Sequence, residues 1–425
     1  MTLTWRRIGT GIGLSLALAL GGASLIVDAP PAHADQVRDL EYWLNDYGFT
    51  QAWATTRGAG VKVAVIDTGV AVNIPELTGA VVGGTDVSGL GTVNGRTPVG
   101  DRSEHGTLVS TLMAGRGSGD GTGIIGVAPA ASILAVSVAF GDTTASLSND
   151  DQIAEGIRWA VDNGADVINM SLTRNTLDWP TSWDDAFLYA FENDVVVVAA
   201  AGNRGSGTTE VGAPATIPGV LTVGGVDRNK AASFDASSQG ITISVAAPSE
   251  QLVGVVPGGG YVQWDGTSAA APIVSGLVAL VRAAYPELDA AEVINRVIAT
   301  ANPNGHSVPS PIYGNGLIDA AAAVTAPVPA STSPTPTQLL EEWIRLHRRA
   351  DTVPTPAPET TAVAPIPPKD DPAVPDHNLA GAWLPGPLSL TYVTVPLMVL
   401  VGFAILVTLF GVGATRHFKR LRTKR

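Results

Sequence analysis

The stretch that decides the fold is VKVAVIDTG, residues 61–69. Its first six residues are almost all apolar and mostly β-branched, and Asp67, Thr68 and Gly69 follow at once. Such a run is typical of a strand that is buried on both faces of a parallel sheet. Because open parallel sheets bind ligands beyond the carboxyl ends of their strands, Asp67 is a candidate functional residue. Taken alone, it is better interpreted as an ordinary turn aspartate.

The same alternation continues through residues 35–325. Apolar runs predict further strands at 131–138, 166–170 and 195–200, and helical periodicity predicts helices at 152–163 and 186–193. Strands that alternate with helices build a doubly wound parallel sheet with flanking helices. The predicted fold class of this region is therefore α/β.

Histidine is scarce in this region, which narrows the search for a general base. Only His105 and His306 fall within it, and His306 lies in a polar loop between two prolines. His105 instead opens a run with helical character that continues to residue 114. Since histidine is the usual acid–base residue near neutral pH, His105 is the candidate base.

Two further polar residues stand at the ends of apolar segments. Ser268 precedes an apolar helix expected at 273–284, and a helix N-terminus favours a developing anion. Asn203 closes the strand at 195–200 and offers a side-chain amide as a hydrogen-bond donor. Each also has a plain structural interpretation, Ser268 as a helix cap and Asn203 as a turn residue.

Together the four motifs resemble those of the subtilisin-like serine proteases. The chain carries DTG at 67–69, HGT at 105–107, AAAGN at 199–203 and GTSAAAP at 266–272, in the Asp, His, Ser order of that family. The resemblance covers about residues 50–325. It implies a subtilisin-like fold and peptide-bond hydrolysis without a cofactor.

The resemblance also assigns roles. Ser268 would attack the scissile carbonyl, His105 would take its proton, and Asp67 would orient the imidazole. Asn203 and the Ser268 N–H would bind the oxyanion. Substrate-binding residues would be Ser171 and Leu172 along the substrate strand, Ala200, Ala201 and Gly202 in the first specificity pocket, and Thr267 beside the oxyanion site.

The N-terminus has the features of an export signal. Arg6 and Arg7 precede an uncharged, mostly apolar run at 8–27, and Ala32-His33-Ala34 is a small-x-small cleavage site. We therefore expect a signal peptide at 1–34, with an uncleaved membrane anchor as the alternative. Residues 35–49 would form an extension that packs on the domain through Leu40, Trp43, Leu44, Tyr47 and Phe49.

The C-terminus has the features of a membrane span. Residues 388–414 are 27 residues without a charge, long enough as a helix to cross a bilayer core of about 30 Å. Six Lys and Arg residues and no acid follow at 415–425, which predicts a cytoplasmic tail. We therefore expect a single-pass protein of the cell membrane whose catalytic domain, about residues 50–325, is extracytoplasmic.

Between domain and span lies a proline-rich linker, residues 326–387, with 14 of the chain's 30 prolines. It contains one amphipathic helix, expected at 337–350, where Glu341 precedes Arg345 by four residues. This helix could be solvated or loosely docked, or it could dock a partner or a membrane surface.

Composition excludes several functions. The 425 residues contain no cysteine, so disulfides, cysteine catalysis and thiolate metal sites are excluded. The net charge is −13, and without the signal and the tail it is −20, which argues against nucleic acid as a partner. We find no convincing calcium loop and expect no metal, because Asp101, Asp120 and Asp142 are isolated.

The order of these segments resembles the mycosins, membrane-anchored subtilisin-like proteases associated with type VII secretion. Only residues 35–50 separate the cleavage site from the domain, too few for a folded inhibitory propeptide. The chain departs from relatives in lacking cysteine and in carrying Ala269 and Thr173, so no cleavage preference is transferred.

Two functions remain open at this point. The resemblance implies a processing endopeptidase for secreted protein substrates that associates with a type VII secretion membrane complex. The alternative is a structural component that stabilises that complex, with proteolysis secondary. A broad degradative protease is a weaker third interpretation, because a tether restricts access to substrates.

Overall fold

The computed structural model describes residues 34–141, 144–207 and 209–348, all within the first of two compact units, Met1–Val353. The predicted signal peptide and transmembrane segment, residues 1–34 and 388–414, lie outside these residues apart from Ala34, as do the tail and the linker beyond residue 348. The strands are β1 (Lys62–Asp67), β2 (Val81–Asp86), β3 (Ser132–Ser137), β4 (Val167–Met170), β5 (Val196–Ala200), β6 (Leu221–Val226), β7 (Ile243–Pro248), β8 (Leu252–Val255) and β9 (Tyr261–Trp264). The helices are α1 (Ala34–Asp39), α2 (Tyr42–Asp46), α3 (Phe49–Ala52), α4 (His105–Ala114), α5 (Asn149–Asp162), α6 (Thr181–Glu192), α7 (Thr267–Ala284), α8 (Ala290–Ala299), α9 (Ala320–Thr325) and α10 (Pro336–His347).

A seven-stranded parallel sheet forms the centre, in the order β2-β3-β1-β4-β5-β6-β7. β1 lies between β3 and β4, and its last residue, Asp67, is in register with Ser137. The chain changes direction across the sheet at this point, where open α/β sheets bind their ligands. The predicted α/β class is confirmed, and so are the strands predicted around β1, β3, β4 and β5.

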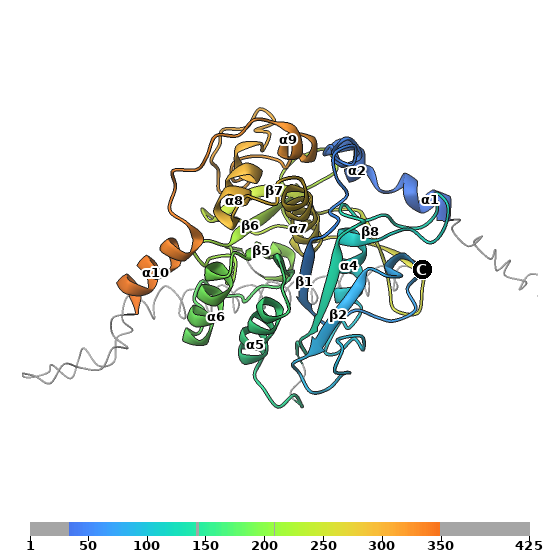
Figure 1. Cartoon of the computed structure of the whole chain (residues 1–425), viewed down its shortest axis with the longest axis horizontal. Helices are drawn as coiled ribbons and strands as arrows, with labels where there is room; N and C mark the ends of the chain where they lie inside the picture. Colours follow the sequence, from blue (N-terminus) through green and yellow to red (C-terminus); the bar gives the residue numbers. More distant parts are fainter. Residues whose placement is uncertain (1–33, 142–143, 208, 349–425) are drawn as a thin grey trace, which may run out of the picture. The chain divides into compact units, whose positions relative to one another are not determined.

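Alternate residues of β1 pack in two separate cores, because successive side chains of a strand point to opposite faces of the sheet. Val63 and Val65 pack in the core that α4, α7 and α8 cover, while Ala64 and Ile66 pack in the core beneath α5 and α6. Figure 1 shows the two layers of helices on either side of the sheet. Burial on both faces explains why the sequence of this strand shows no alternation of polar and apolar residues.

Helix α7 begins at Thr267, six residues before the helix that the apolar run predicted. It passes through the core on one face of the sheet, and 83% of it is buried. Among the described residues it is the one helix long and apolar enough to cross a membrane, and its burial marks it as a core helix. The early start is what places Ser268 in the first turn of the helix.

The predicted extension packs on the domain through four of its five proposed contact residues. Trp43 and Phe49 are fully buried, and Leu44 and Tyr47 are nearly so. Leu40 is 36% exposed, so the prediction for this residue was wrong. Leu40 lies between α1 and α2, where the chain turns.

Helix α10 is docked rather than solvated. Leu340 is fully buried in the core with α6, and the Trp343 ring lies on that of Trp179 with centroids 4.1 Å apart. Arg345 forms an ion pair with Glu342, three residues before it, and not with Glu341, four residues before it. Both spacings lie on one face of a helix, so the sequence alone does not separate them.

Candidate active site

Asp67 ends β1 and is held by the backbone that follows it. Its carboxylate is 1% exposed, and Oδ1 accepts the N–H of Thr68 at 2.7 Å. The Thr68 hydroxyl in turn donates to the Ser103 carbonyl and accepts the Gly106 N–H. These bonds tie the end of β1 to the start of α4 and so fix the distance between Asp67 and His105.

His105 is the first residue of α4, and it faces Asp67. Its Nδ1 lies 2.9 Å from both carboxylate oxygens. Since an ionised carboxylate only accepts hydrogen bonds, Nδ1 carries the proton and Nε2 is left free to accept one. The Trp264 ring meets the imidazole edge-on at 5.6 Å and packs against it on another side.

The N-terminus of α7 brings the serine and the asparagine motifs together. Oδ1 of Asn203 accepts both the N–H and the hydroxyl of Thr267, at 2.8 and 2.9 Å. Gly266 has a φ of 137°, and a side chain there would come within 2.9 Å of the Asn203 amide nitrogen. Glycine is therefore required at this close approach. With Oδ1 anchored, Nδ2 of Asn203 remains available as a donor.

Ser268 is the second residue of α7, where N–H groups lack an acceptor within the helix. Its hydroxyl donates to the Ser171 carbonyl at 3.1 Å, and among the described residues it forms no hydrogen bond with His105. Ser and His of a catalytic pair are often apart in structures without substrate and come together in the complex. The Ser268 hydroxyl is therefore bonded to Ser171 and not to His105.

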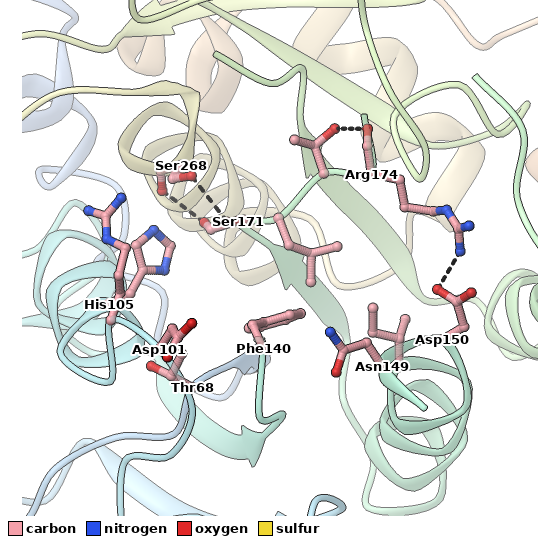
Figure 2. Close-up of a pocket in the computed structure, with 13 residues that line it drawn as sticks. Thr68, Asp101, His105, Phe140, Asn149, Asp150, Ser171, Arg174 and Ser268 are labelled. Carbon is pink, nitrogen blue, oxygen red and sulfur yellow. Dashed lines mark hydrogen bonds and ion pairs between the residues drawn. The ribbon is translucent and has the colours of Figure 1, made fainter. Parts of the chain in front are cut away.

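Ser268 and His105 line one cavity of about 380 Å³. Figure 2 shows the two side chains at one end of it, with Phe140 and Asn149 further along and Arg174 beside Asp150 at the other end. Arg174 forms an ion pair with Asp150 there. The shape is that of a cleft that leads away from the serine, suited to an extended ligand.

Only some of the residues predicted to bind substrate line this cavity. Ser171 and Leu172 line it beside Ser268, whereas Ala200, Ala201 and Gly202 are buried and are not among its lining residues. Thr267 is also buried, and it supports Asn203 and donates no bond toward the cavity. The roles of these residues in substrate binding stay predictions.

Sequence reasoning missed Asp150, Arg174 and Asn169. The first two come from a helix terminus and a loop, and no motif marks them. Asn169 did carry a signal, because it is the polar residue in the buried strand β4, and the structure places it at 0% exposure. A buried amide has to find hydrogen-bond partners, which points to a specific role.

The described residues contain no group of three or more histidine or acidic side chains that could hold a metal ion. Asp101 and Asp120 are exposed, and Asp142 is outside the described residues. None of residues 34–53 lines the cavity, so the extension contributes no wall to it.

Comparisons with known proteins agree with this geometry. The profile of the subtilase family matches residues 58–316. Subtilisin DY of Bacillus licheniformis is 40% identical over 270 residues, which is 63% of this chain and 92% of the relative. Subtilisin E of Bacillus subtilis is also 40% identical, and the match covers 66% of its length.

Among solved structures, the MycP3 protease from the type VII (ESX-3) secretion system is 32% identical, with a TM-score of 0.57 over 67% of this chain and 88% of that one. A family match over more than half of the chain, together with the subtilisin identities, settles its class. This chain belongs to the subtilase family and is a subtilisin-like serine endopeptidase.

Proposed function

We propose that Asp67, His105 and Ser268 form the catalytic triad and that Asn203 is the oxyanion donor. The observation that carries the proposal is the pair of 2.9 Å contacts between His105 Nδ1 and Asp67, in a cleft that Ser268 also lines. The contacts fix the tautomer whose free Nε2 can take the serine proton.

The mechanism follows from these positions. The Ser268 hydroxyl leaves the Ser171 carbonyl, turns to His105 Nε2 and attacks the scissile carbonyl as its proton passes to the imidazole. Asp67 stabilises the imidazolium that results. The oxyanion is bound by the Ser268 N–H and Asn203 Nδ2, and the N-terminus of α7 adds a favourable dipole. His105 then returns the proton to the leaving amine, and water hydrolyses the acyl-enzyme by the same path.

We further propose that the domain acts outside the cell, tethered to the cytoplasmic membrane by residues 388–414 with a cytoplasmic tail at 415–425. The support is the charge pattern, an acidic body followed by an uncharged run and a basic end. The likeness to the MycP3 protease from a type VII secretion system supports a role in type VII secretion, which we propose is the limited processing of secreted proteins.

A structural role in the secretion complex remains the second candidate. Its support is the same likeness to a protein from a type VII secretion system, because a membrane complex can need such a component for its assembly as well as for its activity. The two candidates differ in what the serine is needed for.

Fluorophosphonate labelling of the full chain, beside Ser268→Ala, tests the triad. We expect the wild-type chain to be labelled and the variant not to be, whereas a folded wild-type chain without label would favour the structural role.

Complementation of a deletion strain separates the biological roles. Loss of secretion with Ser268→Ala indicates a processing protease, and full secretion with it indicates a scaffold.

A further inference from the structure

The main-chain carbonyl of Ser268 has lost its normal helical partner. In an α-helix the carbonyl of a residue accepts the N–H four positions later. Four positions after Ser268 stands Pro272, inside α7, and proline has no N–H. The carbonyl of the serine is thus left open within a buried segment, because Pro272 and the residues beside it are buried.

Ser171, the residue that follows β4, provides the missing donor. Its hydroxyl donates to the Ser268 carbonyl at 2.8 Å, while its own carbonyl accepts the Ser268 hydroxyl at 3.1 Å. The two residues are therefore joined by reciprocal bonds, one to the backbone of the serine and one to its side chain. Ser171 is 3% exposed, and its hydroxyl is taken up by the bond to the Ser268 carbonyl.

Two buried residues hold the Ser171 hydroxyl in place. The Asn169 amide donates to it at 3.0 Å, and the Ser275 hydroxyl donates to the Asn169 oxygen at 2.8 Å. Asn169 and Ser275 are both 0% exposed. Ser275 lies seven residues after Ser268, two turns along the same face of α7. The chain of bonds therefore starts on α7, crosses to β4 and returns to α7 at the serine.

We propose that Ser171 is a positioning residue for the reaction, which fixes the backbone of Ser268 at the point where Pro272 leaves it free. This inference rests on the proposed role of Ser268 as nucleophile. The bond to the Ser268 carbonyl sets the orientation of the first turn of α7, and hence both the Ser268 N–H that binds the oxyanion and the Cβ that carries the nucleophile. The Ser171 carbonyl holds the hydroxyl until substrate draws it to His105.

Substitution of Ser171 by Ala removes the donor and leaves the Ser268 carbonyl and the Asn169 amide without partners. A small displacement of a reacting group can cost about 100-fold in rate. We expect the inactivation rate constant of a fluorophosphonate on the full chain to fall about 10- to 100-fold for Ser171→Ala. Its binding constant should change less than about twofold, because no contact to the probe is lost. The midpoint of the pH profile should not move, since His105 and Asp67 keep their contact.

The pairing with Pro272 provides a rescue that a merely structural role would not show. Ser171→Ala combined with Pro272→Ala restores an N–H four residues after Ser268, so the helix itself can satisfy the carbonyl. We expect the double variant to label faster than Ser171→Ala, with Pro272→Ala alone as the control for its own effect. Ser171→Thr, which retains a hydroxyl, should keep most of the labelling rate.

The outcomes are separable. Wild-type rates for a folded Ser171→Ala would overturn this inference and leave the triad intact, and a double variant no faster than the single would do the same. A folded wild-type chain that is not labelled would overturn the nucleophile itself. If Ser171→Ala does not fold by circular dichroism, Ser275→Ala replaces it, because it loosens only the far end of the chain of bonds. A several-fold slower rate for that variant supports the inference, and an unchanged rate overturns it.

Discussion

Asn203 and Thr267 are linked by two hydrogen bonds that end on a single oxygen. Oδ1 of the asparagine accepts the threonine N–H at 2.8 Å and its hydroxyl at 2.9 Å. An amide whose oxygen is held in this way has only its NH₂ group left for a ligand. The pairing thus decides which end of the Asn203 side chain is presented to an oxyanion.

Asn203→Ala should lower kcat about 10²–10³-fold with little change in KM, the size of effect known for the oxyanion asparagine of subtilisin. Thr267→Val retains the shape and the N–H but removes the hydroxyl, so its effect should be smaller and in the same direction. Steady-state hydrolysis of a peptide substrate by both folded variants measures this. A rise in KM with kcat unchanged for Asn203→Ala would instead indicate a role in substrate binding.

Asp67→Asn tests the tautomer of His105. An asparagine amide can donate to Nδ1, which would leave the proton on Nε2 and deprive Ser268 of its base. We expect kcat to fall about 10⁴-fold in a chain that keeps its fold, as in other triads of this type. Labelling by a fluorophosphonate within about tenfold of wild type would show that the carboxylate is dispensable.

The part of this site that sequence could predict is the part that short motifs encode. Asp67, His105 and Ser268 each stand at the end of a strand or the start of a helix, so local pattern locates them and parallel topology brings them to one edge. Asn169 and Ser275 show the limit. Each is visible as a polar residue in an apolar segment, but their hydrogen bond joins positions 106 residues apart. No local pattern specifies such a pair.

The direction in which individual side chains point could not be predicted from the sequence either. The resemblance assigns Ser171 to substrate binding, which stays a prediction, but no motif indicated that its hydroxyl donates to the Ser268 carbonyl. This bond depends on Pro272, which removes a helical N–H and creates an acceptor for the hydroxyl. The start of α7 was predicted too late, because its first turns consist of small residues such as Ala269. These residues show no apolar periodicity in the sequence although they are fully buried.

Two neighbouring leucines of α10 test whether this helix is docked on the domain in solution. Leu340 is fully buried against α6, whereas its neighbour Leu339 is 40% exposed. Leu340→Ala should lower the free energy of unfolding by about 2–5 kcal/mol, and Leu339→Ala by less than about 0.5 kcal/mol. Urea denaturation of the full chain, followed by tryptophan fluorescence, compares the two. Equal effects would mean that α10 is not docked in solution.

The buried carboxyl of Glu41, in the extension, should make the stability of the folded chain depend on pH. Its side chain is buried between Arg38 and the loop at Ile125, whose N–H it accepts at 3.0 Å, and its second oxygen has no hydrogen-bond partner among the described residues. Burial raises the pKa of this carboxyl from 4.5 to about 9, with Glu76 adding to the rise, while the Ile125 N–H and Arg38 oppose it.

The direction in which stability changes with pH follows from the number of protons that Glu41 binds in the folded and the unfolded chain. Between the unfolded pKa near 4.5 and the folded pKa near 9, the folded chain binds more protons at Glu41 than the unfolded chain does. Its contribution to stability is therefore complete below pH 4.5 and is lost as the pH rises, by up to about 1.4 kcal/mol per pH unit. Glu41→Gln, which keeps an acceptor for Ile125 and cannot ionise, should remove this loss. We expect the variant to melt at a higher temperature than wild type at pH 8 and at nearly the same temperature at pH 4.5. Parallel melting curves of the two proteins across this range would mean that Glu41 is ionised in the folded chain and paired with Arg38.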